Sequence, residues 1–280
     1  MVISTLLKKG AYFLDGRENA LLESEILLSH VLGKSREYFI TDGDSEIPMG
    51  LVDLFWVYMQ RLIKGEPIAY ITQVKEFYGL DFYVDERVLI PRPETEQLVE
   101  IVLKHLNGGP GRVIDVGTGS GAIAVAIAKG CAAAGIVAVD LSEKALEVAR
   151  LNAEQHGVED RVDVFGSDLL EILDDGERFD VIVANLPYIG EVRNRFVSDE
   201  TLKHEPEVAL FGGEGGLELY EKMFKQIVDK NVEFDFMLGE FGFSQGEEMA
   251  GLLDKFFEGA WEIKKDLAGI DRLFTVNMVK

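Results

Sequence analysis

The sequence predicts an α/β fold in which a mainly parallel sheet follows a small helical bundle and a β-hairpin. Three patterns predict it: apolar residues at helical spacing near the N-terminus, an alternating apolar pattern in residues 73–91, and short apolar strands that alternate with helices from Arg112 onward. Strands that are apolar throughout are typical of a parallel sheet covered on both faces. We therefore expect an N-terminal helical domain at residues 1–72, a hairpin linker at 73–92 and the sheet domain at 93–280.

Two stretches of the N-terminal region have the pattern of helices. Apolar side chains recur at helical spacing in residues 21–32 and again in residues 51–63. Gly33 and the acidic, glycine-containing cluster at residues 42–44 interrupt the pattern between the two stretches. We therefore expect this region to form a small bundle of helices.

Residues 73–91 predict a β-hairpin. The apolar positions that carry the strand pattern are Phe77, Leu80, Phe82, Val84 and residues 88–90. A turn near residues 79–81 can join the two strands, since glycine and aspartate are common in such turns. Pro91 and Pro93 end the hairpin, because proline cannot donate a backbone hydrogen bond to a sheet. A helix is then expected at about residues 95–105.

The rest of the chain alternates between strands and helices. The expected strands cover residues 113–116, 136–139, 162–165, 179–184, 234–238, 261–265 and 273–279. A helix is expected at residues 122–129, and another follows Ser142, whose hydroxyl can cap it, and reaches His156. Ligands of such sheets bind beyond the carboxyl ends of the strands. The residues that directly follow the strands are therefore the candidates for a functional site.

A glycine-rich loop joins the first of these strands to the first helix. It consists of Gly117, Thr118, Gly119, Ser120 and Gly121. Glycines allow a tight turn there and let a ligand approach the bare backbone. With Ala122 the loop also fits the G-x-G-x-x-A dinucleotide fingerprint. Asp140 ends the second strand, where an acid can bind ribose hydroxyls, and Leu141 follows it. These features predict a cofactor that contains adenosine.

Asp115 favours S-adenosylmethionine over a dinucleotide. With this acid in the strand, the loop resembles the D-x-G-x-G-x-G motif of class I methyltransferases. A carboxylate near the loop attracts the cationic methionine part of S-adenosylmethionine, whereas it would repel the anionic pyrophosphate of a dinucleotide. The expected fold is thus a Rossmann-like class I S-adenosylmethionine methyltransferase sheet, and the expected product is S-adenosylhomocysteine. Asp168 and Leu169 follow the third strand, where this class often places an acid or amide near the adenine. Asp168 equally fits a helix N-cap.

Asn185, Leu186, Pro187 and Tyr188 directly follow the fourth strand and resemble the [N/D/S]-P-P-[Y/F/W] motif of methyltransferases that act on planar nitrogen. Such a nitrogen is a poor nucleophile because its lone pair is delocalised. The Asn185 side-chain oxygen and the Leu186 carbonyl can accept its two N–H bonds and hold it in line with the methyl group. Pro187 stiffens the turn, and Tyr188 can stack on the planar group. Because Asn185 directly follows this strand, we also expect it to contact the cofactor.

Further segments resemble one family along nearly the whole chain. They include E-P-I-A-Y-I at residues 66–71, F-Y-G-L at 77–80, V-L-I-P-R-P-E-T-E at 88–96, H-E-P-E-V-A-L at 204–210, E-F-G-F-S-Q at 240–245 and D-L-A-G-I-D-R at 266–272. The family is the PrmC/HemK protein-(glutamine-N5) methyltransferases of class 1 peptide-chain release factors. Leu186 stands where proline is common, and Leu169 stands where some members have an aromatic residue.

This resemblance implies the reaction and its partner. The acceptor would be the glutamine amide of a Gly-Gly-Gln loop, and the N-terminal bundle would hold the release factor. Phe77, Arg92, Pro93 and Thr95 would lie near the mouth of the site and bind the substrate. The enzyme would modulate translation termination.

Charge helps to separate the competing functions. The chain has 28 Lys and Arg against 50 Asp and Glu, a net charge of −22. This argues against a DNA N6-adenine methyltransferase, which shares the acceptor motif but needs a basic cleft, and favours a basic protein or peptide as partner. A glutamine methyltransferase of a ribosomal large-subunit protein stays open as an alternative. A non-catalytic binding module of this fold would be expected to have a degraded cofactor loop or acceptor motif, and both are intact.

No metal and no membrane segment are expected. The four histidines and the single cysteine, Cys131, share no metal-ligand spacing. No apolar run approaches the roughly 18 residues of a membrane span. Residues 1–16 do not have the pattern of a signal peptide, and one cysteine allows no internal disulfide, so we expect a cytoplasmic protein.

Overall fold

The structure is a computed structural model that describes residues 1–190, 199–266 and 268–278. Its contacts divide the chain into two compact units. One comprises Met1–Val74 with Asp199–His204, and the other comprises Lys75–Ser198 with Glu205–Lys280. Each unit has its own hydrophobic core and is described by itself below.

The first unit is helical, as the spacing of its apolar residues predicts. Its helices are α1 (Ile3–Phe13), α2 (Ala20–Leu32), α3 (Tyr38–Thr41), α4 (Met49–Ile63), α5 (Ile68–Thr72) and α9 (Asp199–His204). The helices expected at residues 21–32 and 51–63 are α2 and α4. Leu6, Leu27 and Phe55 are completely buried in the core that α1, α2 and α4 share.

Gly10 explains how closely α1 packs against its neighbours. A Cβ atom on Gly10 would lie 2.8 Å from Cζ of Phe55 on α4 and 2.9 Å from Oγ of Ser24 on α2. Glycine is normally unfavourable inside a helix because of its backbone freedom. Here it is required by space, since any side chain would push two buried neighbours apart.

A two-stranded sheet of β1 (Val74–Phe77) and β2 (Leu80–Tyr83) follows. Tyr78 and Gly79 form its turn with φ angles of 53° and 73°, so the turn lies slightly before the position expected from the sequence. The expected strand character of residues 88–90 is wrong. Val88 and Ile90 are buried there, but their amides bond to Asp85 and Glu205 instead of a neighbouring strand, so burial alone explains the apolar run.

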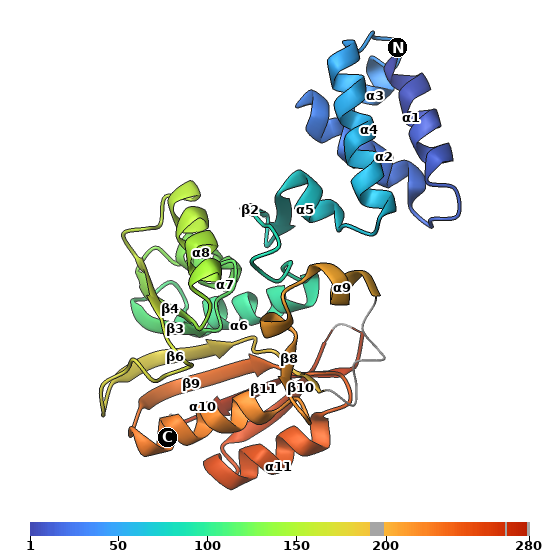
Figure 1. Cartoon of the computed structure of the whole chain (residues 1–280). Coiled ribbons are helices and arrows are strands. Elements are labelled where there is room, and N and C mark those ends of the chain that lie inside the picture. The colour runs from blue at the N-terminus through green and yellow to red at the C-terminus, as the bar shows by residue number, and fades with distance from the viewer. Residues whose placement is uncertain (191–198, 267, 279–280) are drawn as a thin grey trace. The chain divides into compact units, whose positions relative to one another are not determined.

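A seven-stranded sheet forms the centre of the second unit (Figure 1). Its strands are β3 (Gly111–Val116), β4 (Ala134–Asp140), β5 (Val162–Gly166), β6 (Arg178–Ala184), β9 (Glu233–Glu240), β10 (Trp261–Lys265) and β11 (Asp271–Asn277). Their order is β10-β11-β9-β6-β3-β4-β5. Strands β3 to β6 and β9 are parallel, while β11 runs antiparallel to β9 and β10 antiparallel to β11. The prediction of a mainly parallel sheet is therefore confirmed.

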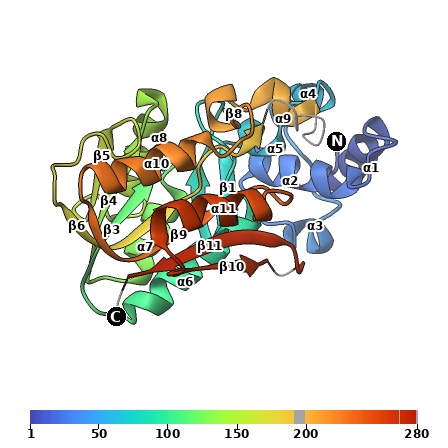
Figure 2. The ribbon, with the colours of Figure 1, turned by 90° about the horizontal axis from the view of Figure 1, so that it is seen from below.

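Helices cover both faces of this sheet. They are α6 (Glu96–Leu106), α7 (Ala122–Gly130) and α8 (Glu143–Gln155) on one face, and α10 (Glu218–Asp229) and α11 (Gly246–Phe257) on the other (Figures 1 and 2). Side chains alternate between the two cores along each strand: Val113 packs toward α6 and α7, and Ile114 toward α10 and α11. Oγ of Ser142 accepts a bond from the Ala145 amide, which confirms the expected cap of α8.

Short elements complete the second unit near the carboxyl ends of the parallel strands. The 3-10 turn η1 (Pro93–Thr95) precedes α6, and β7 (Ile189–Gly190) pairs in parallel with β8 (Phe211–Gly213). A second 3-10 turn, η3 (Glu207–Ala209), leads into β8. In the part of the chain that the structure describes, no helix is both long and apolar enough to cross a membrane.

Gly10→Ala tests the packing of α1. Alanine favours a helix over glycine by up to about 1 kcal/mol, but its Cβ would collide with Phe55 and Ser24, and overpacking costs about 1–3 kcal/mol. We expect a lower free energy of unfolding in urea. The matched control is Gly50→Ala in α4, where a Cβ meets nothing within 4 Å. If Gly10→Ala stabilises the protein as much as Gly50→Ala does, the close packing is wrong.

Candidate functional site

A cavity of about 250 Å³ opens at the carboxyl ends of the parallel strands, within the second unit. The loops after β3, β4, β5 and β6 all contribute to its wall, as expected for an open parallel sheet. The residues from these loops are Gly117–Ser120, Asp140–Ser142, Ser167–Leu169 and Asn185–Pro187. The remaining wall comes from Phe77, the segment between Arg87 and Thr95, the start of α7, Ala145 of α8, and Val208, Ala209, Phe211 and Leu219.

The glycine-rich loop needs its glycines for three different reasons. Gly117, Gly119 and Gly121 all have positive φ angles, of 74°, 56° and 79°. A Cβ on Gly117 would lie 2.9 Å from the Leu186 side chain, and one on Gly121 would lie 3.1 Å from Ala149 of α8. A Cβ on Gly119 would meet no protein atom within 4 Å. Gly119 therefore leaves open space at the cavity wall, where a ligand can approach the backbone.

Asp140 is held rigidly at the end of β4. Its Oδ2 accepts a 2.9 Å hydrogen bond from the Gly119 amide, and its Oδ1 accepts a 2.8 Å bond from the Ser142 amide. Burial raises the pKa of this carboxyl, while the backbone amides of Ser142, Gly119 and Leu141 oppose the rise. A carboxylate offers about four acceptor positions. Acceptor capacity is thus left for a hydroxyl donor of a ligand such as a ribose, and Leu141 lines the same cavity.

Asp115 does not line the cavity; it lies completely buried beneath the glycine-rich loop. Its Oδ2 accepts a 2.6 Å hydrogen bond from the Thr118 hydroxyl. Its Oδ1 has no hydrogen bond of standard geometry from the residues described. Burial raises the pKa of Asp115 to about 7, against the effects of the Thr118 hydroxyl and the Ala124 amide. This acid fixes the loop directly, and its contact with a cationic group stays a prediction.

The acceptor loop presents two oxygen atoms. Asn185, Leu186 and Pro187 line the cavity, and Nδ2 of Asn185 donates a 3.1 Å hydrogen bond to Oγ1 of Thr95. Within the described residues neither Oδ1 of Asn185 nor the Leu186 carbonyl accepts a hydrogen bond. Such a pair of acceptors suits a group with two N–H bonds. The Leu186 amide, which a proline would lack, donates to the Tyr220 hydroxyl at 3.4 Å.

Tyr188 and Thr95 both donate to the buried carboxylate of Glu240 at the end of β9. The distances are 3.0 Å from the Tyr188 hydroxyl to Oε1 and 2.7 Å from the Thr95 hydroxyl to Oε2. Burial raises the pKa of Tyr188. Among the described residues, the cavity lining includes Thr95 but not Tyr188. The stacking of Tyr188 on a substrate therefore stays a prediction, and its observed contact is with Glu240.

Three more residues were expected at the mouth of the site. Phe77 lines the cavity and packs edge to face on Phe82, with ring centroids 6.0 Å apart. Arg92 also lines it, and its guanidinium bonds at 2.5 Å to Glu205, which in turn accepts the Ile90 amide at 3.2 Å. Pro93 starts η1 and lies outside the lining of the described cavity.

Asp168 lines the cavity, which its predicted position near a ligand requires. Its carboxylate forms an ion pair with Lys222 of α10. The alternative interpretation of Asp168 as a helix N-cap is wrong, because turns follow it. Gln226 of α10 explains this: it bonds to the Asp168 carbonyl and to the Leu170 amide and so holds the segment out of a helix. Leu169 lies between them with a φ angle of 56° and lines the cavity.

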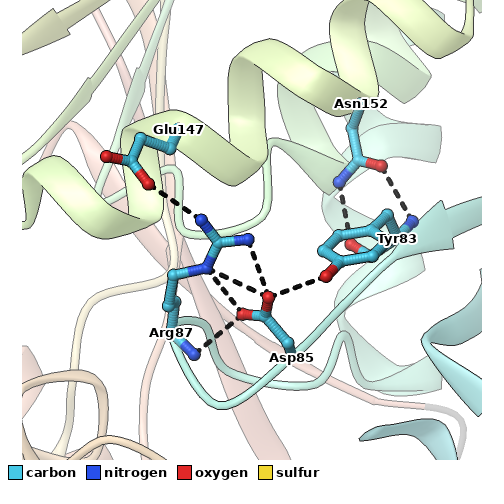
Figure 3. Close-up of polar contacts among 5 residues, drawn as sticks. All are labelled: Tyr83, Asp85, Arg87, Glu147 and Asn152. Atoms are coloured by element: carbon cyan, nitrogen blue, oxygen red, sulfur yellow. Dashed lines mark hydrogen bonds and ion pairs between the residues drawn. The ribbon is translucent and has the colours of Figure 1, made fainter.

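A polar cluster connects the hairpin and the segment that follows it to α8 (Figure 3). Asn152 of α8 is completely buried; it accepts the Tyr83 amide at 2.8 Å and donates to the Tyr83 carbonyl at 3.0 Å and the Ser120 carbonyl at 2.8 Å. Arg87 lines the cavity and pairs with Asp85 and Glu147.

Sequence reasoning assigned no role to Arg87, Asn152, Glu205 or Glu240. Glu205 and Glu240 had a signal, since both lie in segments that resemble the family, and Glu240 also ends a strand of the parallel sheet. Across the described residues, no group of three or more His, Cys, Asp and Glu side chains could hold a metal ion.

Comparison with known proteins identifies the relatives of this chain. The PrmC N-terminal domain model matches residues 5–72, and the model of ribosomal protein L11 methyltransferase (PrmA) matches residues 94–207. The release factor glutamine methyltransferase of Neisseria gonorrhoeae is 41% identical over 254 residues, which cover 90% of this chain and 91% of the relative. The enzyme of the same name from Bacillus anthracis is 36% identical over 282 residues, or 98% of each chain.

Solved structures share the fold at low identity. The hMettl16 catalytic domain, determined with the MAT2A 3′UTR hairpin 6, has a TM-score of 0.58 and 15% identity and covers 81% of this chain and 83% of its own. A methyltransferase from Pyrococcus furiosus has a TM-score of 0.51 and 18% identity, and the match covers 78% of this chain and 96% of the methyltransferase. These likenesses confirm the fold class that the sequence predicts.

Asp115→Asn tests the burial of this acid. Its pKa is about 7 in the folded protein and about 3.9 in an unfolded chain. Between these values the folded state binds more protons, so this group makes the free energy of unfolding fall as the pH rises. Relative to Asp115→Asn, the wild type should lose stability from about pH 4 to about pH 7 in urea titrations. Asp163→Asn, at an exposed site on β5, is the control. A pH-independent difference for Asp115→Asn contradicts the prediction.

Proposed function

The chain belongs to the release factor glutamine methyltransferase family, and we propose that it transfers a methyl group from S-adenosylmethionine to the side-chain amide nitrogen (N5) of a glutamine in peptide-chain release factors. It is an S-adenosylmethionine-dependent methyltransferase by its relatives and its fold. The substrate is proposed because it is the one that the relatives' names state. Release factors act in translation termination, which the modification would modulate in the cytoplasm.

One observation carries the proposal for an amide acceptor. Asn185 and Leu186 line the same cavity as Asp140 and the glycine-rich loop, and among the described residues neither the Asn185 side-chain oxygen nor the Leu186 carbonyl accepts a hydrogen bond. A primary amide has two N–H donors on one planar nitrogen, and these two oxygens match them. Accepting both bonds orients the nitrogen and increases its electron density, so catalysis rests mainly on positioning. The amide nitrogen gains the methyl group and releases one proton.

The residues around the cavity fit S-adenosylmethionine. Asp140 would hold the ribose hydroxyls with its remaining acceptor positions, and Gly119 leaves space for close approach to the backbone. Asp168 and Leu169 would lie near the adenine, and Asp115 would add negative charge beneath the loop for the cationic end. When bound, the cofactor supplies an electrophilic methyl group on a sulfonium. Thr118, Ser120, Gly117, Gly121 and Leu141 would complete the cofactor site.

Mass spectrometry tests the substrate. A release factor incubated with the enzyme and S-adenosylmethionine should gain one methyl group on the glutamine of its Gly-Gly-Gln loop. A release factor in which that glutamine is replaced by alanine should gain none. Methylation of a glutamine in a ribosomal large-subunit protein, with the release factor left unmodified, would support the alternative substrate instead.

Asn185→Ala separates positioning from cofactor binding. We expect turnover with the release factor to fall by at least about a hundredfold, because one of two acceptors that orient the nitrogen is lost. The affinity for S-adenosylmethionine, measured by calorimetry, should be nearly unchanged. Unchanged turnover would show that the two-acceptor arrangement is wrong.

Asp140→Ala should weaken the binding of S-adenosylmethionine, which Asn185→Ala should leave nearly unchanged. Loss of the carboxylate removes the expected ribose contact and releases the Gly119 amide, so the affinity for S-adenosylmethionine should fall about tenfold or more. The control is Asp163→Ala, which removes an exposed acid on β5 outside the cavity lining. Equal cofactor affinity in both variants would contradict the assignment of Asp140.

A further inference from the structure

Four side chains beside the cavity form one continuous hydrogen-bond chain. Asn185 donates to Thr95, Thr95 donates to one oxygen of Glu240, and Tyr188 donates to the other oxygen of Glu240. Glu240 is 2% exposed and Thr95 is 4% exposed, so water cannot easily replace these partners. The hydroxyl of Tyr220 also bonds to the main-chain carbonyl of Glu240, which fixes the end of β9.

The direction of these bonds follows from a count of protons. An ionised carboxylate only accepts, so Thr95 must give its single hydroxyl proton to Glu240. The Thr95 oxygen then has only lone pairs left for Asn185. Asn185 must therefore turn its NH₂ group toward Thr95, and its Oδ1 atom faces the other way. Glu240 thus sets the orientation of the Asn185 amide through the Thr95 hydroxyl that lies between them.

Given the proposed function, we propose that Glu240 is a positioning residue for methyl transfer. Its carboxylate orients the Thr95 hydroxyl so that Asn185 presents Oδ1, and not Nδ2, to the amide nitrogen of the substrate. A proton on Glu240 would let this acid donate to Thr95, and Thr95 could then donate to Oδ1 of Asn185. The Asn185 amide would turn, and two N–H groups would face each other across the acceptor site.

Some of the surroundings of Glu240 raise the pKa of its carboxyl, and others lower it. The hydroxyls of Thr95 and Tyr188 and the guanidinium of Arg272, on the neighbouring β11, lower the pKa of Glu240. Burial acts in the other direction and is the largest effect, with a smaller contribution from Glu94 of η1, so the pKa lies above the usual value of a glutamate. Arg272 is itself paired with Asp266. Acidification should therefore protonate Glu240 earlier than an exposed glutamate.

Thr95 variants test the relay without changing a charge. Thr95→Val keeps the shape but removes the hydroxyl, whereas Thr95→Ser keeps the hydroxyl. We expect Thr95→Val to lower kcat for release factor methylation about tenfold or more, with KM for S-adenosylmethionine within about twofold of the wild-type value. The kcat of Thr95→Ser should stay within about threefold of the wild-type value. The control is Thr275→Val, an equally buried threonine on β11 outside the cavity lining. Equal kcat for Thr95→Val and Thr275→Val overturns the proposal.

Glu240→Gln tests the role of the carboxylate. A glutamine can still accept from Thr95, but it cannot take up a proton in this range. The wild type should lose kcat on acidification, and Glu240→Gln should lack this acid limb of the pH profile. An acid limb that is the same in both proteins overturns the proposal.

A substrate-free measurement separates this proposal from the proposed function. In the complex with S-adenosylhomocysteine, the ¹⁵N-labelled side-chain amide of Asn185 should shift with pH in the wild type and not in Glu240→Gln or Thr95→Val. A wild-type resonance that does not titrate overturns the positioning role, even if release factors are methylated. If release factors are not methylated but the resonance titrates as expected, only the proposed function fails.

Discussion

The parallel register of β3, β4 and β6 is the constraint on which the rest of the site depends. Val116 of β3 lies opposite Val139 of β4 and Ala184 of β6, so the three strands end at the same level. The glycine-rich loop, Asp140 and Asn185 each follow one of these ends. Groups that lie far apart in the sequence therefore meet at one edge of the sheet without any further adjustment of the chain.

The contact between Gly117 and Leu186 joins the cofactor loop to the acceptor loop. A side chain at position 117 would displace Leu186, which is 2% exposed and fills the space beneath the glycine-rich loop. Leucine also keeps a backbone amide where proline is common in the motif, and this amide bonds to Tyr220. The rigidity that proline would give the turn is supplied here by packing and by a hydrogen bond.

Local patterns predict the strands of the large sheet and the helices α2, α4, α6, α7 and α8 well, but they do not predict the polar contacts of the site. The apolar runs in β3 and β6 are visible because both faces of these strands are buried, which leaves few polar positions. The run at residues 88–90 has the same pattern and forms no strand, since its partners Asp85 and Glu205 are not strand residues. Thr95, Asn185 and Glu240 meet only after the sheet forms, so no local spacing relates them. The carboxyl ends of β3, β4, β5 and β6 were predicted to within one residue, and β9 extends two residues beyond its predicted end. The hydrogen bonds between the groups at these ends were not predictable.

Asn152 occupies the hydrogen-bonding groups at one edge of the hairpin. Its amide group bonds to both the N–H and the C=O of Tyr83, which is how a neighbouring strand would pair with that residue. A side chain thus takes the place of a third strand at the end of β2. Unpaired strand edges invite association with other chains. The same residue that ties the hairpin to the cofactor loop therefore also occupies the backbone groups through which another strand would pair with Tyr83.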